Sequence, residues 1–423
     1  MSLLSLLPLA VTSVGTYFLF KLKFFFILHP KKTLGKAIAA AGGKNALPSL
    51  SLALAGTLGV GNIVGVAVGI AVGGAGSVFW LLLSSLFALV IKYCESVVSS
   101  DMGDGLGMIG VIEKSFGRLS RAASRSYAAL ALVLSFVMGA ALQSASIGQS
   151  AELGFSLSPS KTAFFLLIFL LIPIIVGNKK IEKITVIVIP LATIVYIFLA
   201  LSTIISNYER IFPAIKLIFR SAFAPESIGG GILGFLFSDK IKEGYLRGIL
   251  SNEAGAGTSS FAHARNGTDD SAAVGIMGMS EVFFDTVVLC MITALATLVS
   301  VDTFSGKGGV LIILSGIGSV YGELSEYLVF LCVFAFAYST IVCWYYYGGC
   351  ACRYLFPKGH GILFSVAFLA FALFGVGIKG DVLIKATDFI LLGLSVISLS
   401  ALMKNSDRIV NLSEKSGIMS FKS

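Results

Sequence analysis

The sequence predicts an all-α polytopic membrane protein of about eleven transmembrane helices, built as a 5+5 inverted repeat with discontinuous helices behind one extra N-terminal helix. Composition is the first reason, because 56% of the 423 residues are hydrophobic and only 13% are charged. A soluble domain cannot cover so much apolar sequence. The second reason is that apolar runs of bilayer-spanning length recur along the chain, and the third is that two of these runs are interrupted by glycine and small polar residues.

The apolar runs, each roughly 20 residues long, define the expected helices in chain order. We expect spans near residues 3–27, 49–73, 77–99, 126–150, 162–177, 184–206, 227–262 (interrupted), 273–300, 326–356, 361–378 and 382–403. The first run begins like a signal sequence, but it has no basic segment ahead of it and is long enough to cross a bilayer. We therefore expect it to remain as the first helix.

The spacing of the spans predicts how the chain is divided. One helix and its basic cytoplasmic loop occupy 1–48, two five-helix sets follow at 49–206 and 207–403, and a cytoplasmic tail occupies 404–423. Because five is an odd number, the second set has the opposite orientation, as in inverted-repeat transporters. The first helix of each set is the broken one.

Basic residues predict the orientation. Lysine and arginine are concentrated in the loops on one side of the spans and in the tail, including Lys31, Lys32, Arg118, Arg121, Arg125, Lys179, Lys180, Lys404 and Arg408. By the positive-inside rule that side is cytoplasmic, so we expect a multi-pass protein of the cell (inner) membrane with its N-terminus outside and its C-terminus inside. The formal charge of +9 then reflects orientation and does not indicate a nucleic-acid partner.

The first break, GTLGVGN at Gly56 to Asn62, is the most informative segment of the chain. Thr57 and Asn62 bring side-chain oxygens to it, and Gly59 and Gly61 bring bare backbone. Exposed carbonyls can bind a cation, and the N–H groups that open the following half-helix can bind a carboxylate. The alternative is a stripe of small residues for close helix packing, because glycine recurs every fourth residue from Gly61 to position 73.

The second break, SNEAGAGTSSFAHAR at 251–265, places Glu253 beside an apolar stretch. A glutamate at membrane depth is costly unless it is paired, so it indicates a structural lock or a site. The alternative is a loop with a helix cap. We expect His263, at the cytoplasmic end of this segment, to be solvated or interfacial.

The ninth span contains adjacent hydroxyls, Ser339 and Thr340, with Trp344 one turn further on. Such hydroxyls can complete a sodium shell or simply bond back to the preceding turn. The aromatic run from Trp344 to Tyr347 is equally typical of an interfacial belt. Gln143 and Asp285, deep in other spans, are either ligands or interhelical hydrogen-bonding residues.

Signatures of enzymes are missing. The chain has three histidines and no HExxH, GxSxG or GxxxxGK motif, so we expect that it is not an enzyme. The cysteines form no CxxC pair and predict reduced structural thiols: Cys94, Cys290, Cys332, Cys343, Cys350 and Cys352.

Taken together, these motifs closely resemble the alanine or glycine:cation symporter family. The blocks that carry the resemblance are GTLGVGNIVGVAVGIAVGGAGSVFW at 56–80, KYCE at 92–95, RGILSNEAGAGTSSFAHA at 247–264, SEVFFDTVVLCMITAL at 280–295 and FAFAYSTIVCWYYYG at 334–348. They lie in the family's order and span most of the chain. The resemblance implies a fold like that of the bacterial leucine transporter and sodium-driven uptake of alanine, D-alanine or glycine.

The resemblance also implies site residues and partners. The substrate site would comprise Thr57, Gly59, Gly61, Asn62, Gln143, Thr340 and Trp344. A sodium ion, the coupling ion, would be held by carbonyls of Ala55, Leu58 and Phe336 with hydroxyls of Ser339 and Thr340. The expected partners are a small amino acid, sodium and the lipid bilayer, without nucleic acid.

The chain departs from the family's pattern at a few positions. Ala75 replaces a usual proline, Leu250 a phenylalanine and Ala145 an asparagine, and GLGMIGV at 105–111 replaces a GGPMYY-like stretch. Leu250 and Ala145 are expected to alter pocket volume or polarity. Two alternatives stay open: a proton-coupled or exchange carrier in which Glu253 or Asp285 takes the proton, and an ion channel.

Overall fold

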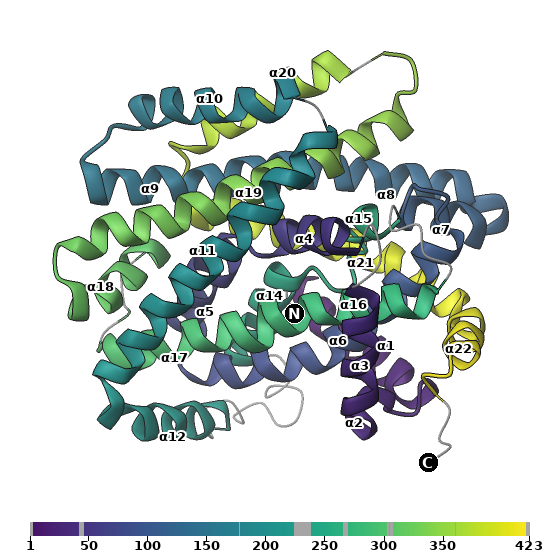
Figure 1. The fold of residues 1–423 in the computed structure, drawn as a ribbon, viewed down its shortest axis with the longest axis horizontal. Helices are drawn as coiled ribbons and strands as arrows, with labels where there is room; N and C mark the ends of the chain where they lie inside the picture. Colours follow the sequence, from purple (N-terminus) through teal and green to yellow (C-terminus); the bar gives the residue numbers. More distant parts are fainter. Residues whose placement is uncertain are drawn as a thin grey trace.

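The computed structural model describes residues 3–41, 46–176, 178–223, 238–264, 270–302, 304, 308–359 and 361–419. Within these ranges the chain consists of helices joined by turns and short loops, which confirms the all-α prediction. Figure 1 shows the long helices packed side by side around a centre that contains the short helices α4 and α15.

The helices appear in the following order. They are α1 (Leu6–Lys21), α2 (Phe25–Leu28), α3 (Pro30–Ala41), α4 (Ala46–Thr57), α5 (Val64–Gly73), α6 (Gly76–Met102), α7 (Met108–Ser115), α8 (Ser120–Leu134), α9 (Gln143–Phe155), α10 (Pro159–Val176), α11 (Asn178–Ser206), α12 (Ile211–Ala222), α14 (Asp239–Asn252), α15 (Ser260–His263), α16 (Ser271–Val282), α17 (Met291–Ser300), α18 (Gly309–Tyr321), α19 (Leu324–Leu355), α20 (Gly361–Gly375), α21 (Gly380–Lys404) and α22 (Ser406–Lys415). Two π-helical segments, Ser135–Leu142 and Phe283–Cys290, join α8 to α9 and α16 to α17.

Most of the expected spans are present. In the described part of the chain, seven helical segments are long and apolar enough to cross a membrane, and a bent pair, Leu50–Thr57 with Val60–Gly73, supplies an eighth. The expected spans 162–177 and 361–378 correspond to the shorter apolar helices α10 and α20. The expected span 227–262 is described only from residue 238, as α14 and α15, since 224–237 lie outside the described residues. The number of spans and the inverted repeat therefore stay predictions.

One apolar helix, α18, lies outside the expected spans. Its 13 residues are rich in isoleucine and leucine, and six of them are buried. Because a helix of that length is only about 20 Å long, it falls below the length criterion that identifies a membrane span. Its burial comes from packing against α5, α11, α17 and α19.

The broken helices lie against α6 and α19, two of the long helices in the described part of the chain. Helix α6 packs along α14 and α16, and α19 packs along α4, α8, α9 and α11. Both breaks are thus enclosed by protein, which a membrane-embedded chain requires wherever backbone hydrogen bonds are lost. All six cysteines are buried thiols that form no disulfide, as predicted.

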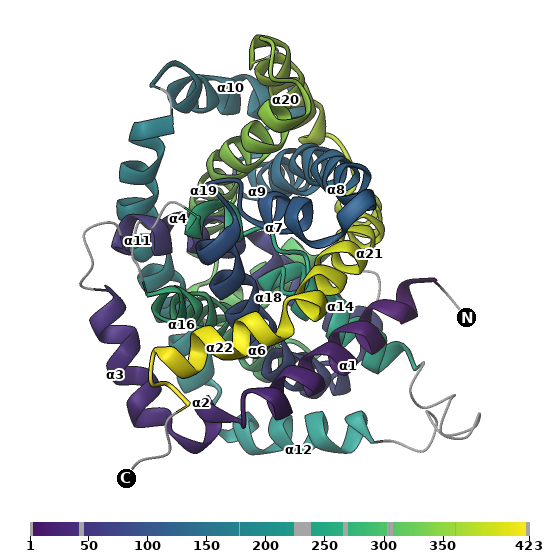
Figure 2. The ribbon, with the colours of Figure 1, turned by 90° about the vertical axis from the view of Figure 1, so that its right-hand side faces the viewer.

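The C-terminal helix α22 lies across the ends of α6, α16 and α21, on the near side of the molecule in Figure 2. The hydroxyls of Ser413 on α22 and Tyr93 on α6 are 2.7 Å apart. The ammonium of Lys21 on α1 donates to the carboxylate of Asp407 at 2.8 Å. The described part of the tail, residues 404–419, therefore packs against the helices α1, α6, α16 and α21.

Candidate functional site at two helix breaks

The first break is an extended link between α4 and a short turn that leads into α5. Helix α4 ends at Thr57, Gly59 is extended (φ −117°, ψ −160°), and a 3₁₀ turn covers Val60–Asn62. The two half-helices are bent by 55° relative to each other. The predicted interruption is confirmed, and it leaves the N–H groups of Gly59 and Val60 without an i→i−4 helical partner.

Side chains from elsewhere in the fold meet these backbone groups. The N–H of Val60 donates to Oε1 of Gln143 at 3.2 Å, and the N–H of Gly59 donates to Oδ1 of Asn62 at 3.2 Å. Gln143 is the first residue of α9, directly after a π-helical segment, and its Nε2 donates to the carbonyl of Met138 at 3.2 Å. The structure therefore brings Gln143 to the first break.

Gly59 lies in close contact with two other predicted site residues. A Cβ on Gly59 would stand 2.8 Å from Oγ1 of Thr340 and 3.1 Å from Oε1 of Gln143. The hydroxyl of Thr340 also donates to the carbonyl of Leu58, the first residue after α4, at 3.4 Å. Gln143 is 3% exposed and Thr340 1%, so these groups meet in a dry interior where polar contacts are strong.

The predicted sodium ligands lie on either side of the contact between α4 and α19. Phe336 and Ser339 belong to α19, and Ala55 and Leu58 belong to the end of α4 and the start of the break. The hydroxyl of Ser339 donates to the carbonyls of Ala335 at 2.8 Å and Phe336 at 3.0 Å. It bonds back to its own helix, the alternative left open by the sequence, whereas Thr340 reaches the carbonyl of Leu58.

The side chains of Thr57 and Trp344 contact residues other than Gly59. The hydroxyl of Thr57 turns back along α4, donating to the carbonyl of Ala53 at 3.3 Å. Trp344 is fully buried, packs edge-on against Tyr347 with ring centroids 5.4 Å apart, and lies against Gly139, where a Cβ would come within 2.3 Å of it. The interfacial-belt interpretation is wrong for Trp344, Tyr346 and Tyr347, because all three are buried.

Asn62 lies beside the second broken helix. Its Nδ2 donates to Oγ of Ser251 at 3.0 Å and to the carboxylate of Asp285. The other carboxylate oxygen of Asp285 accepts from Ser251 at 2.6 Å and Thr286 at 2.8 Å. Asp285, which the sequence left open as ligand or interhelical contact, thus links the two breaks from within a π-helical segment, and Ser251 joins it as a residue not predicted for the site.

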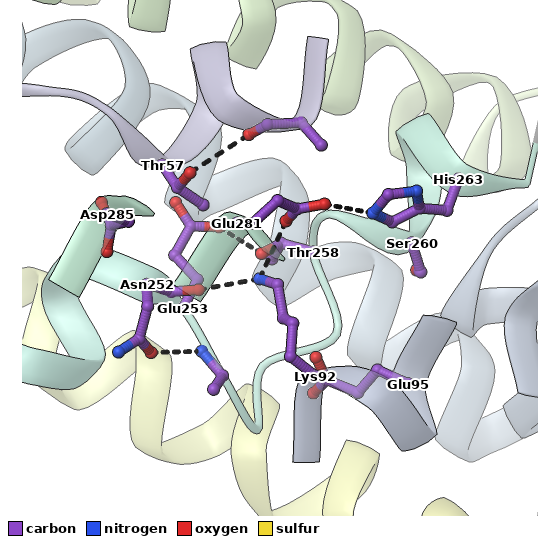
Figure 3. A network of polar contacts seen from close by, with 12 residues as sticks. Thr57, Lys92, Glu95, Asn252, Glu253, Thr258, Ser260, His263, Glu281 and Asp285 are labelled. Carbon is purple, nitrogen blue, oxygen red and sulfur yellow. Dashed lines mark hydrogen bonds and ion pairs between the residues drawn. The ribbon is translucent and has the colours of Figure 1, made fainter. Parts of the chain in front are cut away.

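The second break is held by two charged residues of α6, and Figure 3 shows the contact made by Lys92. Lys92 donates from Nζ to the carbonyl of Asn252, the last residue of α14, at 2.7 Å. Glu95, one turn along the same helix, accepts from the N–H of Gly255 at 2.9 Å. Within the break, Glu253 has a left-handed backbone (φ 55°) and accepts from the hydroxyl of Thr258. The Glu253 side chain thus bonds within the break itself, through Thr258.

His263 is not solvated, so that prediction is wrong. It is fully buried, and its Nε2 contacts Oε1 of Glu281 on α16. The other oxygen of Glu281 lies 3.8 Å from Nζ of Lys92. The reason is that α15 is a short helix enclosed by α4, α6 and α19 rather than the exposed end of a span. Lys92 and Glu95, two charges one turn apart inside an apolar run, are the signal that sequence reasoning missed.

A cavity of about 350 Å³ opens next to the first break. Val60 and Gly61 line it, together with Leu142, Ala145, Leu250, Val376 and Ile384, and its exposed side carries Glu152, Lys379 and Asp381. Two of the positions that depart from the family's pattern, Ala145 and Leu250, are therefore wall residues. Ala75 lies elsewhere, just ahead of α6.

Comparison with known proteins matches the chain to a described protein family. The family model described as the sodium:alanine symporter family matches residues 2–415. The chain is 31% identical over 375 residues to a protein named sodium/alanine symporter AgcS of Methanococcus maripaludis, covering 84% of this chain and 79% of that one. It is 29% identical over 369 residues to a sodium/proton-dependent alanine carrier protein of Bacillus sp. strain PS3, with 81% of each chain covered.

The fold is also similar to that of a solved transporter. The crystal structure of MhsT in complex with L-phenylalanine matches with a TM-score of 0.60 at 16% identity, covering 89% of this chain and 90% of that one. At this identity the likeness concerns the fold alone, and it agrees with the predicted leucine-transporter-like architecture. On the family match and the broken helices together, the chain belongs to the sodium:alanine symporter family, a family of multi-pass secondary transporters and not of enzymes.

Proposed function

We propose that the protein is a sodium-coupled symporter that imports small neutral amino acids, namely alanine, D-alanine and glycine, by alternating access across the cell membrane. The observation that carries the proposal is the convergence on Gly59: the amide of Gln143 and the hydroxyl of Thr340 both lie against a backbone position with no side chain. Bare peptide groups facing fixed polar side chains form a site that suits a small zwitterion.

The substrate carboxylate would bind at the N-terminal end of the half-helix that follows the break. The N–H groups of Val60 and Gly61 open this half, and a helix N-terminus favours a negative charge. Val60 now donates to Gln143, so the carboxylate would take over that donor and Gln143 would turn its amide toward the ligand. Trp344, packed against Gly139, would limit the volume left for the substrate side chain.

Sodium would bind between α4 and α19. The carbonyls of Ala55, Leu58 and Phe336 and the hydroxyls of Ser339 and Thr340 are uncharged oxygens of the kind a hard cation accepts. Thr340 already lies 3.4 Å from the Leu58 carbonyl, so a small rotation of each hydroxyl would turn its lone pairs toward a shared ion. Because the ion would link the break to α19, its binding would order the segment that receives the substrate.

One sodium ion supplies enough energy for uptake. Moving one charge through 100 mV releases about 2.3 kcal/mol, and a tenfold sodium gradient adds about 1.4 kcal/mol. The sum can concentrate a net-neutral amino acid several hundredfold. A stoichiometry of one sodium per substrate is therefore sufficient.

The cavity beside Gly61 would be the entry route. Its exposed residues Glu152, Lys379 and Asp381 lie near the end of α9 and at the start of α21, on the side opposite the basic loops, which the positive-inside rule would make external. The described conformation would then be open toward the outside, with the N-terminus outside and the C-terminus in the cytoplasm.

A counterflow panel in proteoliposomes tests the proposal. Vesicles loaded with unlabelled alanine are diluted into radiolabelled glycine, L-alanine, D-alanine, glutamine or phenylalanine, with sodium or with potassium in its place. We expect saturable, sodium-dependent accumulation of the three smallest substrates and weak accumulation of the larger ones. Accumulation that is equal in potassium would contradict sodium coupling, and flux without saturation would indicate a channel.

A further inference from the structure

A cavity of about 370 Å³ lies between the last turns of α19 and the start of α20, and the proposed transport cycle does not use it. Tyr345, Gly349 and Arg353 line it from α19, and Phe364 lines it from α20. Gly349 contributes no side chain to this space, and even a Cβ there would stand 3.5 Å from Nη1 of Arg353 and 3.7 Å from the ring of Phe364. The cavity is therefore a gap between two helices with a cationic side chain in its wall.

Arg353 is the group that gives this cavity a chemical preference. It lies exposed, two residues before the end of α19, and it forms no ion pair with a carboxylate in the described part of the chain. Its Nη2 donates to Sγ of Cys350 at 3.1 Å, and a thiol is a weak acceptor. Because a guanidinium has five donors in a planar fork that matches a phosphate, most of its hydrogen-bonding capacity is left for a ligand.

The charge around the cavity favours an anion. A second hollow, of about 480 Å³, adjoins the first and also contains Arg353. Tyr354 lines this second hollow, and its side chain interacts electrostatically with Arg121 at the start of α8 and with Glu113 on α7. Lys358 lies in the connection between α19 and α20. Three cationic side chains thus stand against one carboxylate around the two hollows.

The flank of the cavity is apolar. Ile362 and Val366 of α20 are 83% and 58% exposed, and in a membrane such side chains lie against acyl chains. Inside the cavity the rings of Tyr345 and Phe364 stack with their centroids 5.4 Å apart. A ligand bound here would meet a guanidinium at one end and an apolar, lipid-facing surface at the other, which is the chemistry of a phospholipid.

The depth of the cavity agrees with this chemistry. Helix α19 has 32 residues and is therefore about 48 Å long, which exceeds the roughly 30 Å of a hydrocarbon core. Its last turn consequently extends into the polar layer of the bilayer. In the orientation proposed above, this end of α19 lies on the cytoplasmic side, where anionic lipids attract lysine and arginine.

We propose that the cavity between α19 and α20 binds the headgroup of an anionic phospholipid, with Arg353 holding the phosphate and the exposed face of α20 receiving an acyl chain. Basic pockets between helices on the cytoplasmic side are typical of headgroup sites. Lipid binding here takes its leaflet from the orientation in the proposed function, and it depends on neither the amino-acid substrate nor the coupling ion.

Native mass spectrometry of the full chain in detergent tests the proposal. The chain is titrated with phosphatidylglycerol, with phosphatidylethanolamine or with inorganic phosphate. We expect one retained phosphatidylglycerol per chain, about tenfold weaker binding of phosphatidylethanolamine, and no displacement of the lipid by millimolar phosphate. Equal affinity for the two lipids would overturn the proposal. Displacement by phosphate would also overturn it, because the site would then select the free anion.

Two variants separate the role of the cation from that of the cavity. Arg353→Gln removes the charge at an exposed position and should weaken phosphatidylglycerol binding about tenfold. Gly349→Leu keeps Arg353 but fills the cavity, and it should weaken binding by a similar factor, whereas general attraction to a basic surface would not change. The matched control is Arg220→Gln, an exposed arginine of α12 on the opposite side, which should bind as the wild type does. Wild-type affinity in either Arg353→Gln or Gly349→Leu would reject the site.

The proposed function is tested separately by counterflow. Because the comparison of the two lipids uses the wild-type chain, failure of a variant to fold does not protect the lipid site. Equal binding of both lipids by a chain with normal sodium-dependent counterflow would reject the lipid site alone. Absence of amino-acid counterflow in a chain that selects phosphatidylglycerol would reject the proposed function alone.

Discussion

The ammonium of Lys92 lies 2.7 Å from the carbonyl oxygen of Asn252, the residue at which α14 stops. This contact replaces one of the hydrogen bonds that the chain loses by breaking its helix, and Glu95 replaces another by accepting from Gly255. A break inside a membrane is stable only when such groups are satisfied. Helix α6 therefore acts as the support on which the second break is built.

Lys92→Met should destabilise the fold strongly. The substitution keeps the length of the side chain but leaves the Asn252 carbonyl without its donor. It also removes the positive charge that faces the carboxylates of Glu95, Glu253 and Glu281. Removing one partner of a buried ionic group typically costs about 3–5 kcal/mol. The measurement is the melting temperature of the purified protein in detergent. The control is Lys114→Met, which breaks a half-exposed ion pair with Asp104 and should cost less than about 1 kcal/mol. Equal melting temperatures for the two variants would contradict the supporting role of α6.

Gly59→Ala should remove transport while the protein still folds. The added methyl would stand 2.8 Å from the Thr340 hydroxyl and 3.1 Å from the Gln143 amide, so it would occupy the point where these groups converge. Sodium-dependent alanine uptake measures the effect. Gly361→Ala is the control, because no atom lies within 4 Å of a methyl group there, and it should transport normally. Wild-type uptake by Gly59→Ala would reject Gly59 as a site residue.

Thr340→Val should weaken sodium binding in particular. The change keeps the shape of the side chain but removes the hydroxyl that faces the Leu58 carbonyl. Loss of one ligand of this kind costs about 1–1.5 kcal/mol, which raises the half-saturating sodium concentration about tenfold. Uptake measured over a range of sodium concentrations gives this value. The matched control is Thr297→Val, because the hydroxyl of Thr297 donates to the carbonyl of Thr293 in its own helix. An unchanged sodium dependence would remove Thr340 from the ion site.

Leu250→Ala should broaden substrate selection. Leu250 lines the cavity next to Gly61, so a shorter side chain would make room for a larger substrate. Discrimination by one methylene is worth about 1–3 kcal/mol, so the preference for alanine over a larger aliphatic amino acid should fall about tenfold or more. Competition against labelled alanine uptake measures the ratio. The control is Leu363→Ala, on an exposed face of α20, which should leave the ratio unchanged. An unchanged ratio in Leu250→Ala would show that Leu250 does not determine substrate selectivity.

The sequence predicts the general plan well because that plan depends on composition and spacing. Apolar runs locate the long helices, and the glycine cluster at Gly56 to Asn62 locates the first break, since both signals are local. Motif resemblance brings together Gln143, Thr340 and Gly59, and the structure places these three side by side.

The remaining features depend on tertiary contacts, which local patterns do not contain. His263 was expected in solvent because it follows an apolar run, yet its environment is decided by Glu281, 18 residues further along. Helix α18 is buried although it is too short to be a span. One π-helical segment holds Asp285 and the other directly precedes Gln143. Both are mostly apolar, and no residue in either predicts the change in helical register.

The hydrogen bond from Val60 to Gln143 would affect the rate at which a bound substrate dissociates. This peptide donor is occupied by Gln143 in the structure, so a substrate carboxylate bound as proposed would exchange one partner for another and gain only the difference between a charged and a neutral acceptor. Under the proposed function, Gln143 would regain this donor as the substrate leaves, which would lower the barrier to dissociation. Such an exchange would favour a short residence time of the substrate over tight binding. A short residence time would permit many turnovers per protein.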